Sequence, residues 1–517
     1  MSTRKVRVRF APSPTGPLHI GGVRTALYNY LFAKKHNGDF ILRIEDTDRE
    51  RYVPGAEDYI IESLKWCGIV PNEGVGFGDG SFAPYRQSER KNLYKKYADI
   101  LVESGNAYYA FDTGPELEAL RKKTQPDGVS PLQYDTSTRM SMKNSLALPA
   151  AEVEKRIASG EKYVIRIKMP VNEEIKVTDL IRGEVVVHTS QLDDKVLFKS
   201  DGMPTYHLAN VVDDYLMEIT HVIRGEEWLP SAPLHVLLYK YFGWENVMPQ
   251  FAHLPLLLKP DGHGKLSKRD GDQSGFPVFP LQWTDPVTKE VSSGYRESGY
   301  FPDAVLNILA LLGWHPTRAQ EIFTLDELVR EFSLEHVAKG GAKFDPEKAK
   351  WFNQQYLRSK SDEAVAEIFQ KQLSEKQNEF GFKMPDAEYL KKVCHLLKEK
   401  ASFVNEFWNL GKYFFIAPDT FDKDTIHKKW NEKTEHFFSM LKEKFLAVKI
   451  FAHDELEKTF KQAAEEHGIK SGEVMQLFRV IITGGAGGPA LFEVAALLGK
   501  DELVKRIERA MSEFKLK

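Results

Sequence analysis

The sequence predicts a multidomain chain in which an α/β part with a split parallel sheet precedes an all-α part. At 517 residues the chain is too long for a single hydrophobic core, so several domains are expected. Strand and helix patterns alternate over residues 1–104 and again over 200–262, as they do in a parallel sheet. From about Pro302 onward strand signals almost vanish and helical periodicity continues, so the last part is expected to be helical.

The first strand and the first helix are separated by a tight loop. Residues 6–10 alternate apolar side chains with arginines, which predicts a strand. The prolines and the glycine of residues 12–16 prevent a continued strand or an early helix, so the chain must turn there. Apolar residues three and four apart predict a helix over about 23–31, and Gly38 is expected to end it in a left-handed cap.

The glycine pair Gly21 and Gly22 opens this helix and leaves room for a ligand to approach the backbone closely. Free N–H groups and the helix dipole favour an anion there, and a nucleotide phosphate would fit. His19 precedes the pair. Taken alone, a histidine in this position is more often a buried or capping residue than a functional one.

The rest of the first half continues the alternation of strand and helix. Residues 40–44 suit a second parallel strand that ends in a charged run, and helices are expected over about 55–66 and 85–104. From 105 to 199 short helices mix with strand-like runs such as 163–168 and 184–187. We therefore expect a domain inserted between two halves of one sheet.

The second half of the sheet is expected to open with the strand-like run 194–199. The expected elements that follow are a helix from near Thr205, a strand over 219–224, a helix over about 231–242 and a strand over 252–258. A glycine-rich loop, 259–264, then leads into the basic segment Lys265-Leu266-Ser267-Lys268-Arg269. Alone, this segment would more often be a solvated surface turn.

Two flexible loops, one at the end of each half of the sheet, predict a shared crevice that binds a triphosphate. The chemistry that suits them is attack of a carboxylate on the α-phosphorus of ATP, with pyrophosphate as the leaving group. The nucleophile is already ionised, so the catalyst must position the reactants and neutralise charge. A histidine at a helix start and mobile lysines are suited to that task.

Composition limits the class of protein. A hydrophobic fraction of 42% with 28% charged residues is typical of a soluble globular chain, and the net charge of −3 argues neither for nor against nucleic acid. Apolar runs such as 304–314 are far shorter than a membrane span, and the N-terminus carries no apolar signal core, so a cytoplasmic protein is expected. Cys67 and Cys394 have no neighbours at ligand spacing, which argues against a disulfide framework or a cysteine zinc site.

Six segments of the chain match, in order, the blocks of a known family. Residues 10–22 resemble the HIGH element of class I aminoacyl-tRNA synthetases, and 265–269 resemble their KMSKS element. The family has further sequence blocks between these two elements, and they are similar to residues 43–48, 85–90, 200–214 and 223–228 of this chain. The chain is thus identified as a member of the bacterial glutamyl-tRNA synthetases, because the other glutamyl and glutaminyl branches end in β-barrels.

This resemblance implies a modular organisation. It implies a Rossmann-like catalytic domain in two halves, an inserted domain for the acceptor end of tRNA, a helical stem-contact domain and a helical anticodon-binding domain. The corresponding ranges are 1–104 and 200–262 for the catalytic halves, 105–199 for the insertion, 263–345 for the lysine loop with the stem-contact domain, and 346–517 for the anticodon domain, with a further division near 402 left open. It also favours a monomer.

The resemblance implies roles for individual residues. The planar forks of Arg9 and Arg224 would face the carboxylates of glutamate, although Glu45 and Arg224 could also form a structural ion pair. Ser13, Glu45, Tyr206 and Asn210 would hold its amino group and backbone end. ATP would contact His19, Gly21, Glu227, Trp228, Lys265 and Lys268, with His19, Lys265 and Lys268 as the catalytic groups. Lys400, Arg479 and Thr483 would contact tRNA.

The implied reaction joins L-glutamate to tRNA(Glu) through glutamyl-adenylate, using ATP with Mg²⁺ and releasing AMP and pyrophosphate, with activation dependent on bound tRNA. Whether tRNA(Gln) is also charged stays open. Two alternative hypotheses for the function are a tRNA-independent nucleotidylyltransferase and a non-catalytic RNA-binding protein. The residues 109–111 stand where some members carry Cys-x-Cys, so neither zinc nor another protein-bound metal is expected. The stretch 275–293 is longer than usual and is expected to be a surface hairpin without an assigned function.

Overall fold

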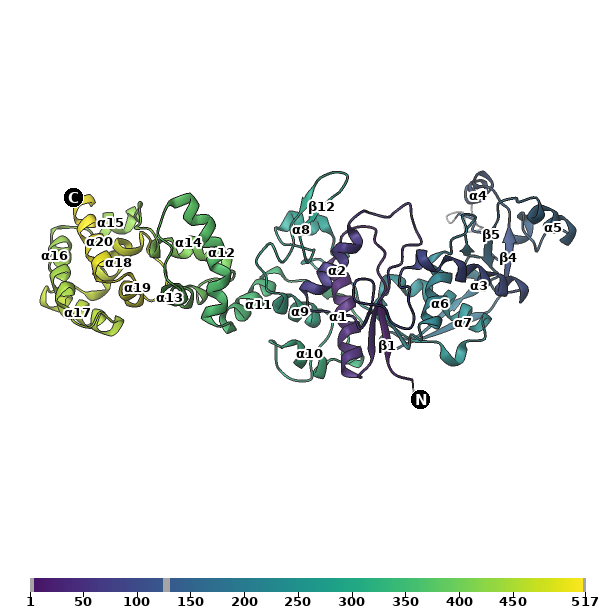
Figure 1. Ribbon diagram of the computed structural model, residues 1–517, viewed down its shortest axis with the longest axis horizontal. Helices are drawn as coiled ribbons and strands as arrows, with labels where there is room; N and C mark the ends of the chain where they lie inside the picture. Colours follow the sequence, from purple (N-terminus) through teal and green to yellow (C-terminus); the bar gives the residue numbers. More distant parts are fainter. Residues whose placement is uncertain (1–3, 124–130, 515–517) are drawn as a thin grey trace. The chain divides into compact units, whose positions relative to one another are not determined.

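The computed structural model describes residues 4–123 and 131–514, and the chain divides into two compact units (Figure 1). The first, which we call the α/β unit, comprises residues 1–298 and 302–346. The second, the helical unit, comprises 299–301 and 347–517. No helix of the described ranges is long and apolar enough to cross a bilayer.

The α/β unit opens with β1 (Arg7–Phe10), α1 (Ile20–Lys35), β2 (Asp39–Leu42), α2 (Ala56–Trp66), β3 (Glu73–Gly74), α3 (Lys91–Glu103), β4 (Ala107–Ala110) and α4 (Gly114–Arg121). It continues with α5 (Ala150–Ala158), β5 (Val164–Ile167), β6 (Glu174–Asp179), β7 (Gly183–His188), β8 (Val196–Phe198), α6 (Tyr206–Leu216), β9 (His221–Gly225), α7 (Ala232–Tyr241), β10 (Gln250–Leu254) and β11 (Leu257–Leu258). It ends with α8 (Lys268–Ser274), β12 (Trp283–Thr284), β13 (Val291–Ser292), α9 (Pro302–Leu311), α10 (Leu325–Glu331) and β14 (Ala342–Lys343).

The helices of the helical unit are α11 (Pro346–Ser359), α12 (Asp362–Phe380), α13 (Ala387–Lys398), α14 (Phe407–Gly411), α15 (Lys423–Lys429), α16 (Glu432–Ala447), α17 (His453–Glu466), α18 (Ser471–Thr483), α19 (Leu491–Leu498) and α20 (Lys500–Glu513). Their ends follow local chemistry. The hydroxyl of Ser361 caps α12, and Gly381 ends that helix with a φ of 71°. Aromatic residues such as Phe437, Phe460 and Phe478 fill the core between helices of this unit. The expected helical character of the last part of the chain is confirmed.

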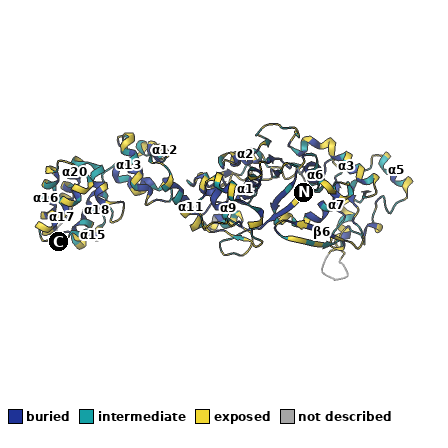
Figure 2. Cartoon of the chain, turned by 90° about the horizontal axis from the view of Figure 1, so that it is seen from below, coloured by how far each residue is buried: buried dark blue, intermediate teal, exposed yellow. Residues whose placement is uncertain are grey.

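The two halves of the α/β unit meet along β1 and β9. The strands β1, β2 and β3 are parallel neighbours, and a second sheet has the order β7-β6-β10-β9. The backbone N–H of Thr220, just before β9, donates to the carbonyl of Arg7 over 2.8 Å, and the Thr220 hydroxyl accepts from the Arg7 N–H at 2.9 Å. Residues of β1, β2 and β9 are largely buried, so the junction lies in the core (Figure 2).

The end of α1 differs from the sequence-based prediction. Gly38 does not adopt the left-handed conformation; Asn37 does, with a φ of 51°. A Cβ atom on Gly38 would lie 2.4 Å from the carbonyl oxygen of Val6. Glycine is therefore required here because β1 and the start of β2 approach each other closely, and asparagine supplies the left-handed turn.

The segment between the two halves contributes to two different sheets. The strands β4, β5 and β8 form an antiparallel sheet, so the run around β8 does not open the second half of the parallel sheet, as its alternation predicted. In contrast, β6 pairs in parallel with β10, and β7 follows β6 as a hairpin. This hairpin was expected inside the insertion 105–199, but its backbone joins it to the sheet of the second half.

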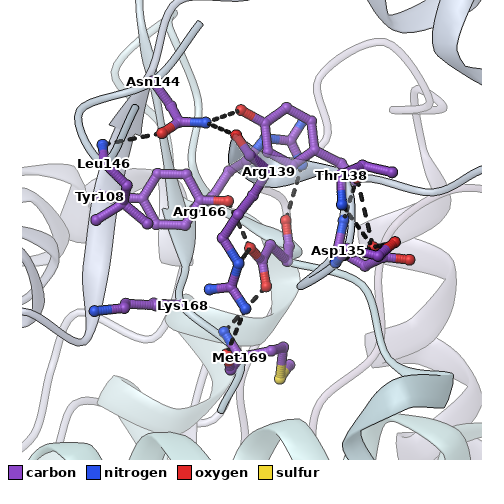
Figure 3. A network of polar contacts seen from close by, with 12 residues as sticks. Tyr108, Asp135, Thr138, Arg139, Asn144, Leu146, Arg166, Lys168 and Met169 are labelled. Atoms are coloured by element: carbon purple, nitrogen blue, oxygen red, sulfur yellow. Dashed lines mark hydrogen bonds and ion pairs between the residues drawn. The ribbon is translucent and has the colours of Figure 1, made fainter. Parts of the chain in front are cut away.

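A buried polar network holds the antiparallel sheet together (Figure 3). The Tyr108 hydroxyl donates to Asp194 Oδ2 over 2.6 Å, and the carbonyl of Asp194 accepts from Arg166 Nη1 at 2.8 Å. Arg139 donates to the carbonyl of Met169 over 2.7 Å and lies 3.4 Å from the Asp194 carboxylate. Side-chain hydrogen bonds thus cross-link the strands of this region at Tyr108, next to residues 109–111.

Candidate active site

The two loops predicted to meet do line one cavity, with a volume of about 580 Å³. Its walls come from the loop before α1, the start of α1, the end of β9, the segment 255–257 and the lysine loop. Of the residues proposed from the sequence, the lining includes Ser13, His19, Gly21, Glu227, Lys265 and Lys268. Segments almost 250 residues apart in the chain therefore line the same cavity.

His19 is the N-cap residue of α1, and its Nδ1 accepts the N–H of Gly21 over 3.1 Å. Burial, followed by the nearby Lys265, lowers the pKa of His19 to about 4, so the imidazole is neutral near pH 7. Because Nδ1 accepts, the ring proton is on Nε2. This Nε2 atom is buried and has no hydrogen-bond partner among the described residues. A buried donor without a partner at a cavity wall suits a phosphate oxygen.

The lysines of the second loop pair with carboxylates beside the cavity. Lys265 Nζ lies 3.1 Å from Glu227 Oε1, and Lys268 Nζ lies 3.0 Å from Glu290 Oε2. Both pairs are largely open to solvent, so each is weak and exchangeable. Lys268 is also the first residue of α8, whose N-cap Ser267 forms a capping box with Asp270.

The stretch 275–293 forms a hairpin as expected, with β12 antiparallel to β13. Its position was not expected from the sequence, since Trp283, Asp285 and Ser292 form part of the cavity wall. The hairpin is attached to α2, where Tyr59 packs edge-to-face on Trp283 at 5.3 Å and its hydroxyl bonds the backbone of Leu281. The hairpin is therefore an additional wall of the cavity and not only a surface feature.

The remaining predicted residues of the α/β unit lie outside this lining. Apart from Trp228, they belong to a buried polar cluster at the ends of β1, β2 and β9. Arg9 makes a two-pronged contact with Asp214, with N–O distances of 3.0 and 3.1 Å. Arg43 lies between Asp214, at 2.8 Å, and Glu45, at 2.9 Å. The amide of Asn210 donates to Glu45 over 2.9 Å. Burial alone would raise the pKa of Asp214, but Arg9 and Arg43 hold it below its usual value.

Arg224 is separately anchored. Its Nη1 donates to the hydroxyl of Tyr206 over 2.6 Å, its Nη2 donates to the carbonyl of Trp228 over 3.2 Å, and its Nε donates to His253. Glu45 does form a structural ion pair, but its partner is Arg43 and not Arg224, and the amide of Asn210 also donates to it. Trp228 packs on the ring of Tyr206 at 4.6 Å and is 42% exposed, which excludes it from the core.

Sequence reasoning missed the partners that fix these arginines. Arg43 and Asp214 stand within the recognised blocks, yet no role was assigned to them. Asp179 and His253 stand outside those blocks. The only sequence signal for such partners is a charged or polar residue within an otherwise apolar strand or helix, and this signal does not name the opposite group.

The residues proposed to contact tRNA belong to the helical unit. Lys400 is exposed just after α13, whereas Arg479 and Thr483 lie on α18. Arg479 donates to the carbonyl of Pro489 over 2.8 Å, and burial lowers its pKa. The three proposed contacts therefore come from two separate places in this unit, the end of α13 and the last turns of α18.

Across residues 4–123 and 131–514, no group of three or more histidine, cysteine, aspartate or glutamate side chains is arranged to hold a metal ion. Cys67 and Cys394 are both buried, and burial raises the pKa of each thiol to about 12. Neither is therefore a reactive thiolate near pH 7.

Two family models match the chain. The model for the catalytic domain of class I tRNA synthetases (E and Q) matches residues 5–351, and the model for an anticodon binding domain matches 363–511. Among curated proteins, the chain is 57% identical to a glutamate–tRNA ligase of Phocaeicola vulgatus, covering 100% of both chains. It is 55% identical to a glutamate–tRNA ligase of Bacteroides fragilis, again over 100% of both.

Solved structures of glutamate–tRNA ligases are also similar to this chain over almost its full length. A crystal structure of a glutamate tRNA ligase from Elizabethkingia meningosepticum in complex with its amino acid superposes with a TM-score of 0.94 at 50% identity, covering 99% of this chain and 100% of that one. The glutamate–tRNA synthetase from Elizabethkingia anophelis superposes with a TM-score of 0.92, also at 50% identity, over 98% of this chain and 100% of the other.

Proposed function

The chain belongs to the class I tRNA synthetases (E and Q), and from this membership we propose that it is a glutamate–tRNA ligase. It activates glutamate with ATP and then esterifies the terminal ribose of tRNA(Glu). The observation that carries the proposal is one cavity, lined by His19 and Lys268, close in sequence and in fold to a buried cluster that contains Arg9. The basic groups of the cavity suit the phosphates of ATP, and the arginines of the cluster suit the carboxylates of glutamate. ATP and glutamate are the two substrates of the first step.

In the proposed first step, a carboxylate oxygen of glutamate attacks the α-phosphorus of ATP, and the bond to the bridging oxygen of pyrophosphate breaks. No general base is needed because the carboxylate is already ionised. Lys265 and Lys268 neutralise charge on the phosphates, while the N–H of His19 Nε2 donates to a phosphate oxygen. ATP would be used as its magnesium complex.

Recognition of glutamate is assigned to the buried polar cluster. Arg9 and Arg224 each retain N–H groups beyond those used in the described contacts, and a planar guanidinium reads a carboxylate well. Glu45 offers a negative charge to the substrate ammonium, with Ser13, Tyr206 and Asn210 completing the contacts. Gly21, Glu227 and Trp228 are assigned to the nucleotide.

The second step transfers the glutamyl group from the adenylate to tRNA, and AMP leaves. The insertion is proposed to receive the acceptor end and the helical unit the anticodon, with Lys400, Arg479 and Thr483 among its contacts. The proposed activation step requires bound tRNA, and the enzyme acts as a cytoplasmic monomer. A tRNA-independent nucleotidylyltransferase and a non-catalytic RNA-binding protein are not favoured, since the full-length relatives are named as ligases.

The direct test is an aminoacylation assay with purified protein, ATP, Mg²⁺, radiolabelled glutamate and tRNA(Glu). Pyrophosphate release and acid-precipitable glutamyl-tRNA are expected, and their absence with a cognate tRNA contradicts the proposal. The same assay with tRNA(Gln) decides between the discriminating and the non-discriminating form. We propose the discriminating form as the first hypothesis, and charging of both tRNAs at similar kcat/KM would replace it.

A further inference from the structure

Arg224 is the end of a buried polar chain that crosses three neighbouring strands. Its Nε donates to His253 Nε2 over 3.0 Å, and His253 Nδ1 lies 2.6 Å from Asp179 Oδ2. Arg224 on β9 and His253 on β10 are directly paired, and Asp179 ends β6, the next strand. Because directly paired residues stand on the same face of a sheet, strand pairing itself brings the arginine and the histidine together.

The direction of these hydrogen bonds fixes the proton on His253. A guanidinium can only donate, so Nε2 must accept and the ring proton is on Nδ1, where it donates to Asp179. Burial lowers the pKa of His253 against the opposing effect of the Asp179 hydrogen bond, so the ring stays neutral near pH 7. The imidazole is therefore an acceptor aimed at Arg224, and the aspartate selects that tautomer.

Asp179 is itself fixed by the turn between β6 and β7. Its Oδ1 accepts the N–H groups of Ile181 at 2.9 Å and Arg182 at 2.8 Å, and its Oδ2 accepts the backbone N–H of His253 at 3.1 Å. Both Asp179 and His253 have fully buried side chains. The carboxylate cannot rotate without losing these hydrogen bonds, so the whole chain of contacts is rigid.

Arg224 has five N–H groups, and three of them are used by His253, Tyr206 and Trp228. Within the described part of the molecule, one N–H on each terminal nitrogen is left for a ligand. We propose that His253, held by Asp179, is a positioning residue that orients Arg224 so that these two N–H groups meet a carboxylate of glutamate. This inference rests on the proposed function, in which Arg224 contacts the amino acid.

The test is the KM for glutamate compared with the KM for ATP, measured in tRNA charging. His253→Leu removes the acceptor and is expected to raise the KM for glutamate about tenfold or more while the KM for ATP changes less than twofold. His253→Gln keeps an acceptor oxygen and is expected to restore the KM for glutamate to within about threefold of the wild-type value. A value of KM does not depend on how much of the enzyme is active, so partial unfolding does not imitate this result.

Asp179→Asn provides a second, independent variant. An amide nitrogen in place of Oδ2 donates towards His253 Nδ1, so the proton moves to Nε2 and two donors face each other at Arg224. The KM for glutamate is expected to rise as in His253→Leu. Leu254→Val is the matched control, because Leu254 is a buried residue of the same strand on the opposite face, and both KM values should stay within twofold.

The outcomes separate this inference from the proposed function. If the wild-type protein does not charge tRNA with glutamate, the proposed function fails. If it does, and His253→Leu and Asp179→Asn leave the KM for glutamate unchanged or raise both KM values equally, the positioning role is wrong. Loss of folding in His253→Leu leaves the decision to Asp179→Asn and to His253→Gln, which keep polar groups in the buried chain.

Discussion

Lys268 Nζ lies 3.0 Å from the carboxylate of Glu290, so the second lysine of the loop is paired with the hairpin that forms one wall of the cavity. Lys268 is 36% exposed and Glu290 is 61% exposed. An ion pair of this kind contributes about 0–1 kcal/mol. Glu290 therefore competes weakly with any phosphate that binds Lys268.

Removing this competitor should strengthen ATP binding. We expect Glu290→Gln to lower the KM for ATP by up to about fivefold, the ratio that corresponds to about 1 kcal/mol, with the KM for glutamate unchanged. Glu62→Gln is the control, because Glu62 is similarly exposed and pairs with Arg296 at 2.7 Å outside the cavity lining. A higher KM for ATP in Glu290→Gln would show that the pair instead holds Lys268 in its working position.

Lys268 should matter more for chemistry than for tRNA binding. Loss of one group that stabilises charge in a transition state typically costs about a hundredfold or more in rate. Lys268→Ala is therefore expected to lower the rate of pyrophosphate release about a hundredfold and to change the Kd for tRNA less than twofold, measured by rapid quench and filter binding. Lys5→Ala, an exposed lysine that pairs with Asp39 at 2.6 Å, should alter neither. Equal losses of rate and tRNA affinity for Lys268→Ala would contradict its assigned role.

The local elements were predictable because their signals are local. Helix bounds such as Ala56–Trp66 follow from three- and four-residue spacing, and the glycine-proline loop before α1 predicts a turn whatever surrounds it. The run around β8 shows the limit of this reasoning. A short apolar run predicts a strand but not its neighbour, and β8 pairs with β5 rather than with the parallel sheet.

The site was predictable as a set of motifs but not as a set of contacts. His19, Lys265 and Lys268 stand in recognisable segments, and the cavity brings them together. The partners of the arginines could not be predicted, because the pairing of Arg9 with Asp214 joins residues 205 positions apart and depends on how α6 packs against β1. The role of Gly38 was misjudged for the same reason, since its constraint is the approach of another strand.

Three partly buried histidines predict how stability depends on pH. Burial lowers the pKa of His19, His207 and His221 to about 4 in the folded state, below the ordinary value of 6.5. Between pH 6.5 and about 4 the unfolded chain therefore binds protons that the folded chain does not, and the free energy of unfolding falls as the pH is lowered. The loss at pH 5 should be on the order of 1–2 kcal/mol for each histidine.

Urea unfolding at pH 7 and pH 5 measures this effect. His207→Gln removes one titrating group, so the difference in unfolding free energy between the two pH values should shrink. His263→Gln, an exposed histidine of the loop before Lys265, is the control and should leave the difference unchanged. An equal pH dependence in wild type and His207→Gln would show that His207 takes up its proton in the folded protein as well.

Asp214 is the shared counter-ion of Arg9 and Arg43, and its carboxylate is almost completely buried. Asp214→Asn leaves two buried guanidiniums with one charge less to balance them, and breaking a buried ion pair in this way costs about 3–5 kcal/mol. Asp48→Asn is the matched control, since Asp48 pairs with Arg51 at the surface and such a pair is worth about 0–1 kcal/mol. Urea unfolding measures the loss of unfolding free energy in both variants. In the fraction of Asp214→Asn that still folds, the KM for glutamate should rise because Arg9 is no longer fixed. A loss of less than about 1 kcal/mol would mean that Glu45 alone balances the arginines, in which case the carboxylate of Glu45 would be less accessible to the ammonium of a substrate.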